Sequence, residues 1–296
     1  MTKVLISDKL SPSAAKIFRE RGVDTDVKPG LSPDELLNII GDYDGLAIRS
    51  ATKVTEEVLN AATNLRVVGR AGIGVDNVDI WAATKRGVIV MNTPHGNSVT
   101  TAEHAITMIL ALARQIPEAN TSTKAGKWEK SRFMGTEITG KTLGLVGCGN
   151  IGAVVAERAQ GLKMRVVGYD PYLSSENAKR LGIEKLEFND LLNRADFITL
   201  HTPLTDATQN ILDANALNKT KKGVRIINCA RGGLVDELAM AAALKSGHVA
   251  GAAFDVFEVE PAKDNILFSF ENVIATPHLG ASTTEAQEKV DRKSVV

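Results

Sequence analysis

A glycine-rich turn between a short apolar strand and a helix-compatible segment constrains this chain more than any other feature. Residues 143–152 read Leu-Gly-Leu-Val-Gly-Cys-Gly-Asn-Ile-Gly and contain the pattern G-x-G-x-x-G. Gly147 allows a tight turn, Gly149 lets backbone N–H groups approach a pyrophosphate, and Gly152 lets the following helix pack closely on the strand. The positive end of that helix then faces the phosphates. The pattern therefore predicts a dinucleotide-binding unit built on a parallel sheet.

An acidic residue after the next predicted strand selects the cofactor. Residues 164–169 are predicted to form that strand, and Asp170 follows it, 18 residues beyond Gly152. A carboxylate at this place can hydrogen-bond a ribose diol. Its charge would repel a 2′-phosphate, and residues 171–173 contain no arginine that would bind one. We therefore expect NAD rather than NADP.

The composition is that of an ordinary globular protein with room for two domains in 296 residues. Lys plus Arg and Asp plus Glu both number 35, so no overall charge favours nucleic acid or a membrane surface. The sequence begins on a strand pattern without a signal-peptide core, and its longest apolar run, residues 106–113, is far shorter than the roughly 20 residues of a membrane helix. Cys148 and Cys229 are spaced unlike a metal cluster. We expect a cytoplasmic protein, two buried thiols and no metal site.

Short apolar runs alternate with helical patterns in both halves, which predicts an α/β protein with two doubly wound parallel sheets. Predicted strands of the first half lie near residues 3–7, 45–49, 66–69 and 88–91. The second sheet is expected to have about six strands, with those after the two described above near 197–200, 224–227, 251–254 and 273–275.

The order of the segments predicts where the two domains divide. One long helix is predicted over residues 99–124, and the last six residues are expected to be unstructured or truncated. If the helix that starts at Ser282 returns to the first half, a Rossmann NAD-binding domain (97–281) is inserted into a flavodoxin-like substrate domain (1–96 and 282–296).

Three ionisable residues follow strands of the second sheet, where the ligand crevice of an open parallel sheet lies. Oxidation of a hydroxy acid needs a base for the hydroxyl proton, and His278, which follows a strand and a proline, suits that exchange near neutral pH. Glu260 can orient the imidazole and stabilise its protonated form. Arg231 can hold a substrate carboxylate with its guanidinium group. Each residue alone has an ordinary structural explanation, but together they predict a catalytic set.

The chain resembles the D-2-hydroxyacid dehydrogenases along almost its whole length. The matching motifs occupy residues 49–53, 68–77, 91–98, 128–135, 228–233, 255–257 and 277–283. The resemblance implies the same catalytic Arg231, Glu260 and His278. It also implies NAD contacts in addition to the glycines of the turn, at Ile73, Asn150, Ile151, Asp170, Thr202, Cys229, Asp255 and Ala281. Many members have Thr or Ser where this chain has Ile73, so a side-chain hydrogen bond near the nicotinamide is lost there.

The resemblance further implies oxidation of 3-phospho-D-glycerate to 3-phosphohydroxypyruvate, the first step of serine biosynthesis. Arg49 and Arg70, each at the end of a strand, are expected to bind the phosphate with Asn97 nearby, while Gly72 and its neighbours form a nest of N–H groups for the carboxylate. The region around Trp128 is expected to cross to the other subunit of a homodimer, with a tetramer as an alternative.

Two alternatives remain open at this stage. A related enzyme acting on hydroxypyruvate, glyoxylate or another small 2-hydroxy acid would share the catalytic set and differ mainly in its cations, and Arg49 argues against it. An NAD-sensing corepressor-like module uses the same fold, because fold alone does not fix function. Turnover of phosphorylated and unphosphorylated substrates would separate these interpretations.

Overall fold

The computed structural model describes residues 2–94 and 96–294. The chain divides into two compact units: an N-terminal unit of Met1–Asn97 with Ala281–Val296, and a central unit of Ser98–Gly280. Both junctions lie one residue from those expected from the sequence. Each unit contains a parallel sheet, so the prediction of two parallel-sheet α/β domains is confirmed.

The N-terminal unit is built on a five-stranded parallel sheet with the order β2-β1-β3-β4-β5. This is the flavodoxin-like order. Its strands are β1 (Lys3–Ile6), β2 (Asp24–Val27), β3 (Gly45–Ile48), β4 (Val67–Arg70) and β5 (Ile89–Met91). Its helices are α1 (Pro12–Glu20), α2 (Pro33–Ile39), the 3₁₀ helix η1 (Ile40–Asp42), α3 (Glu56–Ala61), α4 (Ile80–Lys85) and α12 (Thr284–Ser294). The start of α2 shows how the sequence sets these bounds, because Ser32 and Glu35 form the capping box that their spacing suggests.

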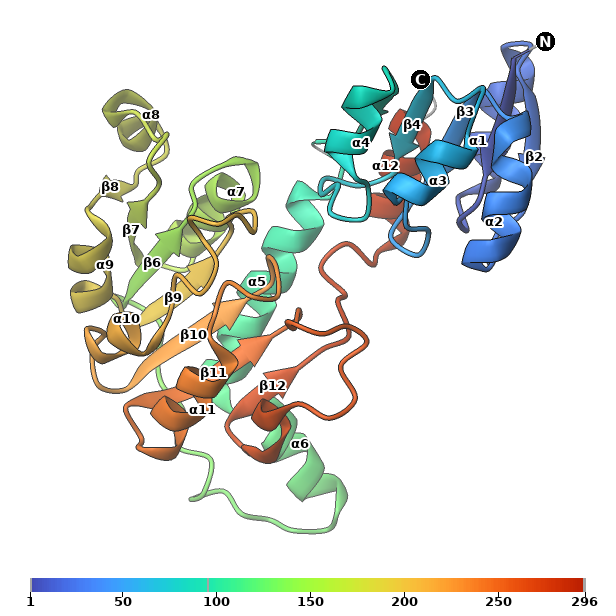
Figure 1. Ribbon diagram of the computed structural model, residues 1–296. Helices are drawn as coiled ribbons and strands as arrows, with labels where there is room; N and C mark the ends of the chain where they lie inside the picture. The colour runs from blue at the N-terminus through green and yellow to red at the C-terminus, as the bar shows by residue number, and fades with distance from the viewer. Residues whose placement is uncertain (1, 95, 295–296) are drawn as a thin grey trace. The chain divides into compact units, whose positions relative to one another are not determined.

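The central unit is built on a seven-stranded parallel sheet with the order β12-β11-β10-β9-β6-β7-β8 (Figure 1). Its strands are β6 (Thr142–Val146), β7 (Arg165–Tyr169), β8 (Glu184–Lys185), β9 (Phe197–Leu200), β10 (Val224–Asn228), β11 (Val249–Phe254) and β12 (Val273–Ala275). Its helices are α5 (Ser98–Arg114), α6 (Ile116–Lys124), α7 (Asn150–Gly161), α8 (Ser175–Arg180), α9 (Phe188–Arg194), α10 (Ala214–Asn218), α11 (Glu237–Lys245) and the 3₁₀ helix η2 (Ile266–Ser269).

Two apolar cores cover the two faces of this central sheet. One core joins α5 and α7 to the sheet through residues such as Ile109, Val155 and Leu145. The other joins α9, α10 and α11 to the opposite face through Leu191, Leu217 and other buried aliphatic residues. Because both faces are covered, the inner strands consist of nearly continuous apolar residues and leave only their ends for chemistry.

Two strands were missed by the sequence analysis, and both lie at a sheet edge. β8 gives the central sheet seven strands instead of about six, and both of its residues are charged and exposed. β2 reads Asp-Thr-Asp-Val and buries only Thr25 fully. An edge strand pairs on one side only and is often polar, so it lacks the apolar run by which inner strands are recognised.

The single long helix predicted over residues 99–124 is wrong: α5 ends at Arg114 and α6 starts at Ile116. Gln115 between them adopts a left-handed conformation with φ of 52°. The cause is Pro117, which has no N–H group to donate to the Ala113 carbonyl. That carbonyl accepts the N–H of Thr136 instead, at 2.8 Å.

The expectation that the last six residues are unstructured is also wrong for residues 291–294, which extend α12. Val290 and Asp291 are buried, and the Asp291 Oδ2 atom accepts the N–H of Ser11 at 2.6 Å. This contact ties α12 to the residue that caps α1. Residues 295–296 lie outside the described part of the chain.

Candidate functional site

The predicted dinucleotide turn is formed between β6 and α7. Gly147 has φ of +96°, and a Cβ atom there would lie 2.7 Å from the backbone of His201. A Cβ atom on Gly152 would overlap the Gly147 carbonyl oxygen. Gly149 caps α7 without a side chain, and a Cβ atom there would meet nothing within 4 Å. The turn therefore needs glycine at two positions for close packing and at the third leaves open space before a helix N-terminus, as a phosphate cradle requires.

Asp170 lies beside this turn. Its Oδ2 atom accepts the N–H of Cys148 at 2.8 Å, and its Oδ1 atom accepts the N–H of Tyr172 at 2.8 Å. A carboxylate is thus fixed at the end of β7, next to the open space before α7.

The two cysteines are free and buried, and burial raises the pKa of both thiols, that of Cys148 to about 12. Neutral thiols of this kind are poor nucleophiles.

Three neighbouring strands, β10, β11 and β12, are followed by the three predicted catalytic residues. Arg231 follows β10, Glu260 follows β11 and His278 follows β12. Because the strands are parallel and adjacent, these residues lie at the same edge of the sheet as the dinucleotide turn after β6. The three strands are consecutive in the sequence and adjacent in the sheet, as consecutive strands of an α/β domain commonly are.

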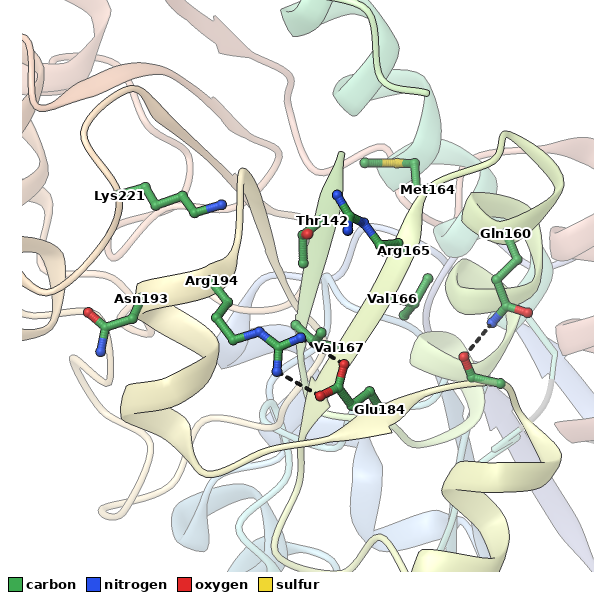
Figure 2. Close-up of a pocket in the computed structure, with 11 residues that line it drawn as sticks. Thr142, Gln160, Met164, Arg165, Val166, Val167, Glu184, Asn193, Arg194 and Lys221 are labelled. Carbon is green, nitrogen blue, oxygen red and sulfur yellow. Dashed lines mark hydrogen bonds and ion pairs between the residues drawn. The ribbon is translucent and has the colours of Figure 1, made fainter. Parts of the chain in front are cut away.

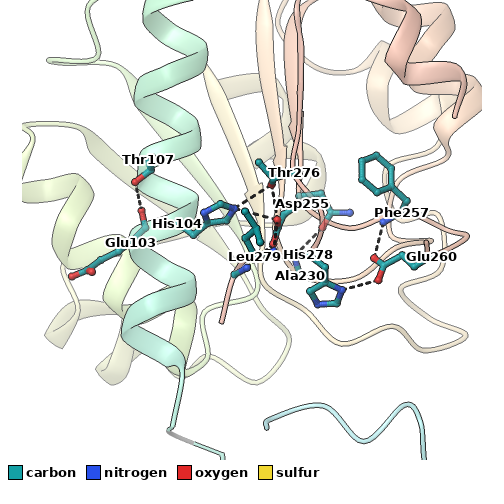
Figure 3. A network of polar contacts seen from close by, with 12 residues as sticks. Glu103, His104, Thr107, Ala230, Asp255, Phe257, Glu260, Thr276, His278 and Leu279 are labelled. Atoms are coloured by element: carbon teal, nitrogen blue, oxygen red, sulfur yellow. Dashed lines mark hydrogen bonds and ion pairs between the residues drawn. The ribbon is translucent and has the colours of Figure 1, made fainter. Parts of the chain in front are cut away.

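The imidazole of His278 is paired with the carboxylate of Glu260. Nδ1 of His278 lies 2.7 Å from Oε2 of Glu260, while Oε1 of Glu260 accepts the N–H of Phe257 at 3.1 Å (Figure 3). The His278 side chain retains 50% of its exposure, so the pair is open to a ligand. The carboxylate fixes the proton on Nδ1 and leaves Nε2 as the atom that can accept one.

The loop that carries Arg231 is held against the loop after β11. The side chain of Asn228 accepts the N–H of Ala230 at 3.1 Å and donates to the Arg231 carbonyl at 2.8 Å. The guanidinium Nη1 of Arg231 donates to the Ala230 carbonyl at 2.7 Å. A Cβ atom on Gly232 would overlap the carbonyl of Phe257. Glycine at this position therefore lets two site loops pack closely.

The sequence analysis did not single out His104, which lies behind this edge on α5. Its Nε2 atom is 3.2 Å from Oδ1 of the fully buried Asp255. Asp255 was expected as a cofactor contact, but its carboxylate also accepts the N–H groups of Leu279 and Gly280 at 2.7 and 2.8 Å. A histidine at the margin of an apolar helix face was the only sequence signal for this contact.

The N-terminal unit positions the two predicted phosphate-binding arginines around Asn77. The Asn77 amide donates to the carbonyls of Arg49 and Thr52 at 2.7 and 2.6 Å, and its oxygen accepts Nε of Arg70 at 3.3 Å. The N–H of Arg49 also donates to Asp8 at 2.6 Å. Asn77 lies in one of the motifs that match the family, residues 68–77, but was not predicted as a site residue.

The proposed nest of N–H groups is partly used by the protein itself. Ala71 N–H donates to the Ile48 carbonyl and Gly72 N–H donates to the Arg70 carbonyl, at 2.8 and 2.9 Å. A Cβ atom on Gly72 would overlap the Arg70 guanidinium, so glycine there makes room for that side chain. Arg49 and Arg70 are half-buried, and Oδ1 of Asn97 is buried with no hydrogen-bond partner among the described residues.

The region around Trp128 leaves that ring 86% exposed. Arg132, in the same region, pairs with Glu129 at 3.2 Å and with Glu271 at 2.9 Å.

A surface hollow in the central unit lies away from the predicted site (Figure 2). Thr142 and Arg165, the first residues of β6 and β7, line it, so it opens at the amino ends of the strands. Arg194 in its wall is bound to both carboxylate oxygens of Glu184, at 2.6 and 2.8 Å. This hollow is a structural feature of the edge opposite to the predicted chemistry.

Among the described helices, none is long and apolar enough to cross a membrane.

Comparison with known proteins places these observations in one family. The model of the D-isomer specific 2-hydroxyacid dehydrogenase NAD-binding domain matches residues 106–280, which confirms the predicted NAD cofactor. The chain is 52% identical over all 296 residues to human D-3-phosphoglycerate dehydrogenase, and spans 56% of that protein's length.

Solved structures extend this similarity to both units. A protein from Thermus thermophilus is 35% identical with a TM-score of 0.91, over 99% of this chain and 94% of its own. A glyoxylate reductase from Paecilomyes thermophila is 28% identical with a TM-score of 0.91, over 99% of this chain and 93% of its own. The chain belongs to the D-isomer specific 2-hydroxyacid dehydrogenase family.

Proposed function

We propose that this chain is an NAD-dependent dehydrogenase that oxidises 3-phospho-D-glycerate to 3-phosphohydroxypyruvate. The observation that carries the proposal is the 2.7 Å contact between His278 and Glu260, formed at the sheet edge that also holds the dinucleotide turn. The choice of substrate is supported by the similarity to D-3-phosphoglycerate dehydrogenases, although the chain spans only about half of their length. It is also supported by Arg49 and Arg70, which both contact Asn77.

The chain's residues fit NAD. The open space beside Gly149 suits the pyrophosphate, and the fixed carboxylate of Asp170 suits the adenosine ribose. When bound, NAD supplies the hydride acceptor for the reaction. The proposed contacts are Ile73, Gly147, Gly149, Asn150, Ile151, Gly152, Asp170, Thr202, Cys229, Asp255 and Ala281.

In the proposed mechanism Nε2 of His278 accepts the proton of the substrate hydroxyl group as hydride leaves the carbon that carries this hydroxyl. Glu260 keeps the ring in the tautomer that can accept that proton and stabilises the imidazolium that forms. Arg231 binds the substrate carboxylate and, in the reverse direction, polarises the carbonyl oxygen. Arg49 and Arg70 bind the phosphate, away from the reacting carbon, with Gly72 and Asn97 beside them.

The division of labour between the units, the subunit arrangement and the location are part of the same proposal. The N-terminal unit binds the substrate and the central unit binds NAD. The exposed Trp128 ring supports a dimer contact, because a large exposed aromatic side chain commonly marks an interaction surface. Two free buried thiols support a reducing, cytoplasmic environment.

Turnover tests the proposal directly. Formation of NADH is measured with 3-phosphoglycerate and, at matched concentration, with unphosphorylated D-glycerate. We expect a kcat/KM at least about tenfold higher for the phosphorylated acid, because a charge-assisted phosphate contact is worth about 1.5 to 3 kcal/mol. Equal turnover of both acids would favour a general 2-hydroxyacid dehydrogenase, faster reduction of glyoxylate would favour a glyoxylate reductase, and NAD binding without any turnover would favour a sensing module.

A further inference from the structure

The carboxylate of Asp255 is buried and accepts hydrogen bonds from residues that follow β12. Asp255 is 0% exposed, and its Oδ1 atom accepts the Thr276 hydroxyl at 2.5 Å and the Leu279 N–H at 2.7 Å. Its Oδ2 atom accepts the Gly280 N–H at 2.8 Å. The Nε2 atom of His104 lies 3.2 Å from Oδ1 and 3.3 Å from the Thr276 oxygen (Figure 3).

The partners of His104 define which of its ring nitrogens carries a proton. Thr276 has one hydroxyl hydrogen and gives it to Asp255, so its oxygen can only accept from His104. The ionised carboxylate is also only an acceptor. Nε2 of His104 must therefore carry a hydrogen, which points between the Asp255 carboxylate and the Thr276 oxygen. Burial alone would raise the pKa of Asp255, but the hydrogen bonds from His104, Thr276 and Leu279 outweigh it and keep the pKa below its usual value.

The backbone held by this junction includes His278. That residue adopts a left-handed conformation with φ of 56°, which is unfavourable for any residue with a side chain. Its N–H donates to the carbonyl of Asp255 at 2.8 Å, and the next two N–H groups donate to the carboxylate of the same residue. Asp255 thus fixes three consecutive peptide groups and holds the imidazole of His278 where Glu260 can reach it.

We propose that His104 is a positioning residue for the reaction, which acts through Asp255 and Thr276 to hold His278 in its strained conformation. The inference rests on the proposed function in one respect, that His278 accepts the substrate proton. The structure supports it because Nε2 of His104 lies 3.2 Å from the buried carboxylate of Asp255. Helix α5 carries none of the three proposed catalytic residues, yet through His104 it supports the loop that carries His278.

The first test compares His104→Ala with His104→Gln, whose amide nitrogen can still donate. The rate of NADH formation is measured with 3-phosphoglycerate in a single turnover of the full chain. We expect His104→Ala to be at least about tenfold slower at saturating substrate with little change in KM, since a lost hydrogen bond to a charged group corresponds to at least that factor. We expect His104→Gln to recover most of the rate.

The matched control is Thr107→Ala on the same helix. The Thr107 hydroxyl donates to the Glu103 carbonyl at 2.8 Å within α5. This variant should therefore keep the wild-type rate. A slow Thr107→Ala variant, or a His104→Ala variant that is as fast as the wild type, would overturn the proposal.

Amide hydrogen exchange gives a readout that does not depend on turnover. We expect His104→Ala to speed exchange at residues 278–280 by at least about tenfold while β6 keeps its wild-type protection. Equal acceleration throughout the central unit would show a structural role only and would overturn the proposal. If the wild-type chain does not turn over 3-phosphoglycerate, the proposed function fails while this exchange comparison still decides whether His104 holds the loop.

Discussion

In the central unit the residues proposed for chemistry are held by their side chains, whereas in the N-terminal unit Arg49 is held by its main chain. The ring of His278 is fixed by Glu260 and the guanidinium of Arg231 by the Ala230 carbonyl. The hydrogen bonds described for Arg49 instead involve its N–H and carbonyl groups.

This difference follows from what each site has to do. Proton transfer depends steeply on the position and orientation of donor and acceptor, so the imidazole needs a fixed ring. Charge attraction changes slowly with distance, so a guanidinium that binds a phosphate can adjust its position. We therefore expect substitutions in the central unit to reduce the rate of chemistry and those in the N-terminal unit to change substrate preference.

The largest effect is expected from His278→Ala. Loss of the proton acceptor should lower kcat by about 10² to 10⁴, the usual range for acid–base assistance. The dissociation constant for NADH should stay nearly unchanged and serves as the control. A variant that keeps more than half of the wild-type kcat would rule out His278 as the base.

A smaller effect is expected from Glu260→Gln, which keeps the size of the side chain but removes its charge. The imidazolium that forms during oxidation loses its stabilising partner, so we expect kcat to fall by about tenfold to a hundredfold. We also expect the acid limb of the kcat/KM profile to move to lower pH. An unmoved profile would show that Glu260 does not stabilise the protonated ring.

In the N-terminal unit, Arg49→Ala and Arg70→Ala should impair 3-phosphoglycerate selectively. We expect kcat/KM for that substrate to fall by about one to two orders of magnitude, with a smaller fall for D-glycerate. Asn77→Ala should show the same selectivity to a lesser degree, because Asn77 contacts both arginines. Equal losses for both acids in all three variants would place the phosphate site elsewhere.

The preference for NAD over NADP tests the role of Asp170, which follows β7. Asp170→Ala combined with Pro171→Arg should shift the ratio of kcat/KM values for NAD and NADP toward NADP, because it removes repulsion and adds a phosphate partner. Asp170→Asn is the control that retains an acceptor for the Cys148 N–H. An unchanged ratio in the double variant would mean that Asp170 does not contact the ribose.

Acid should weaken the central unit before the N-terminal unit. Burial lowers the pKa of His201 to about 4, so between about pH 6.5 and pH 4 the unfolded chain binds a proton that the folded chain does not. Stability present at neutral pH is therefore lost as the pH falls through that window, by up to about 3 kcal/mol. In the N-terminal unit, hydrogen bonds from Tyr43 and Lys3 lower the pKa of Asp26, so its contribution is lost only at more acidic pH.

Hydrogen exchange at about pH 7 and about pH 5 can report on each unit separately. We expect the protection of the central unit to fall more over this range, and His201→Asn to remove the extra loss. If both units lose protection equally, or if His201→Asn retains the acid sensitivity, His201 is not the cause.

The sequence predicted the inner strands because burial on both faces leaves a mostly apolar run, as in β9. It also placed Arg231, Glu260 and His278 after the ends of strands, where the structure has them. Edge strands such as β8 left no such run. The break at Gln115 could have been inferred from Pro117 two residues later.

The supporting contacts were harder to predict than the elements themselves. His104 lies on a helix far from Asp255 in the sequence, and neither the periodicity nor the spacing of residues relates the two. Asn77 likewise contacts Arg49 across a loop whose path depends on the folded backbone. Contacts of this kind follow from tertiary packing, which a single sequence does not display.

The close approach of Gly232 to the Phe257 carbonyl bears on how freely this protein can change during evolution. Gly232 need not touch any ligand, yet any larger residue would push apart the loops that carry Arg231 and Glu260. A survey of all substitutions should therefore find this position among the least tolerant in the chain, as intolerant as His278. Homologues that shift their substrate range would have to vary other positions and inherit this one unchanged.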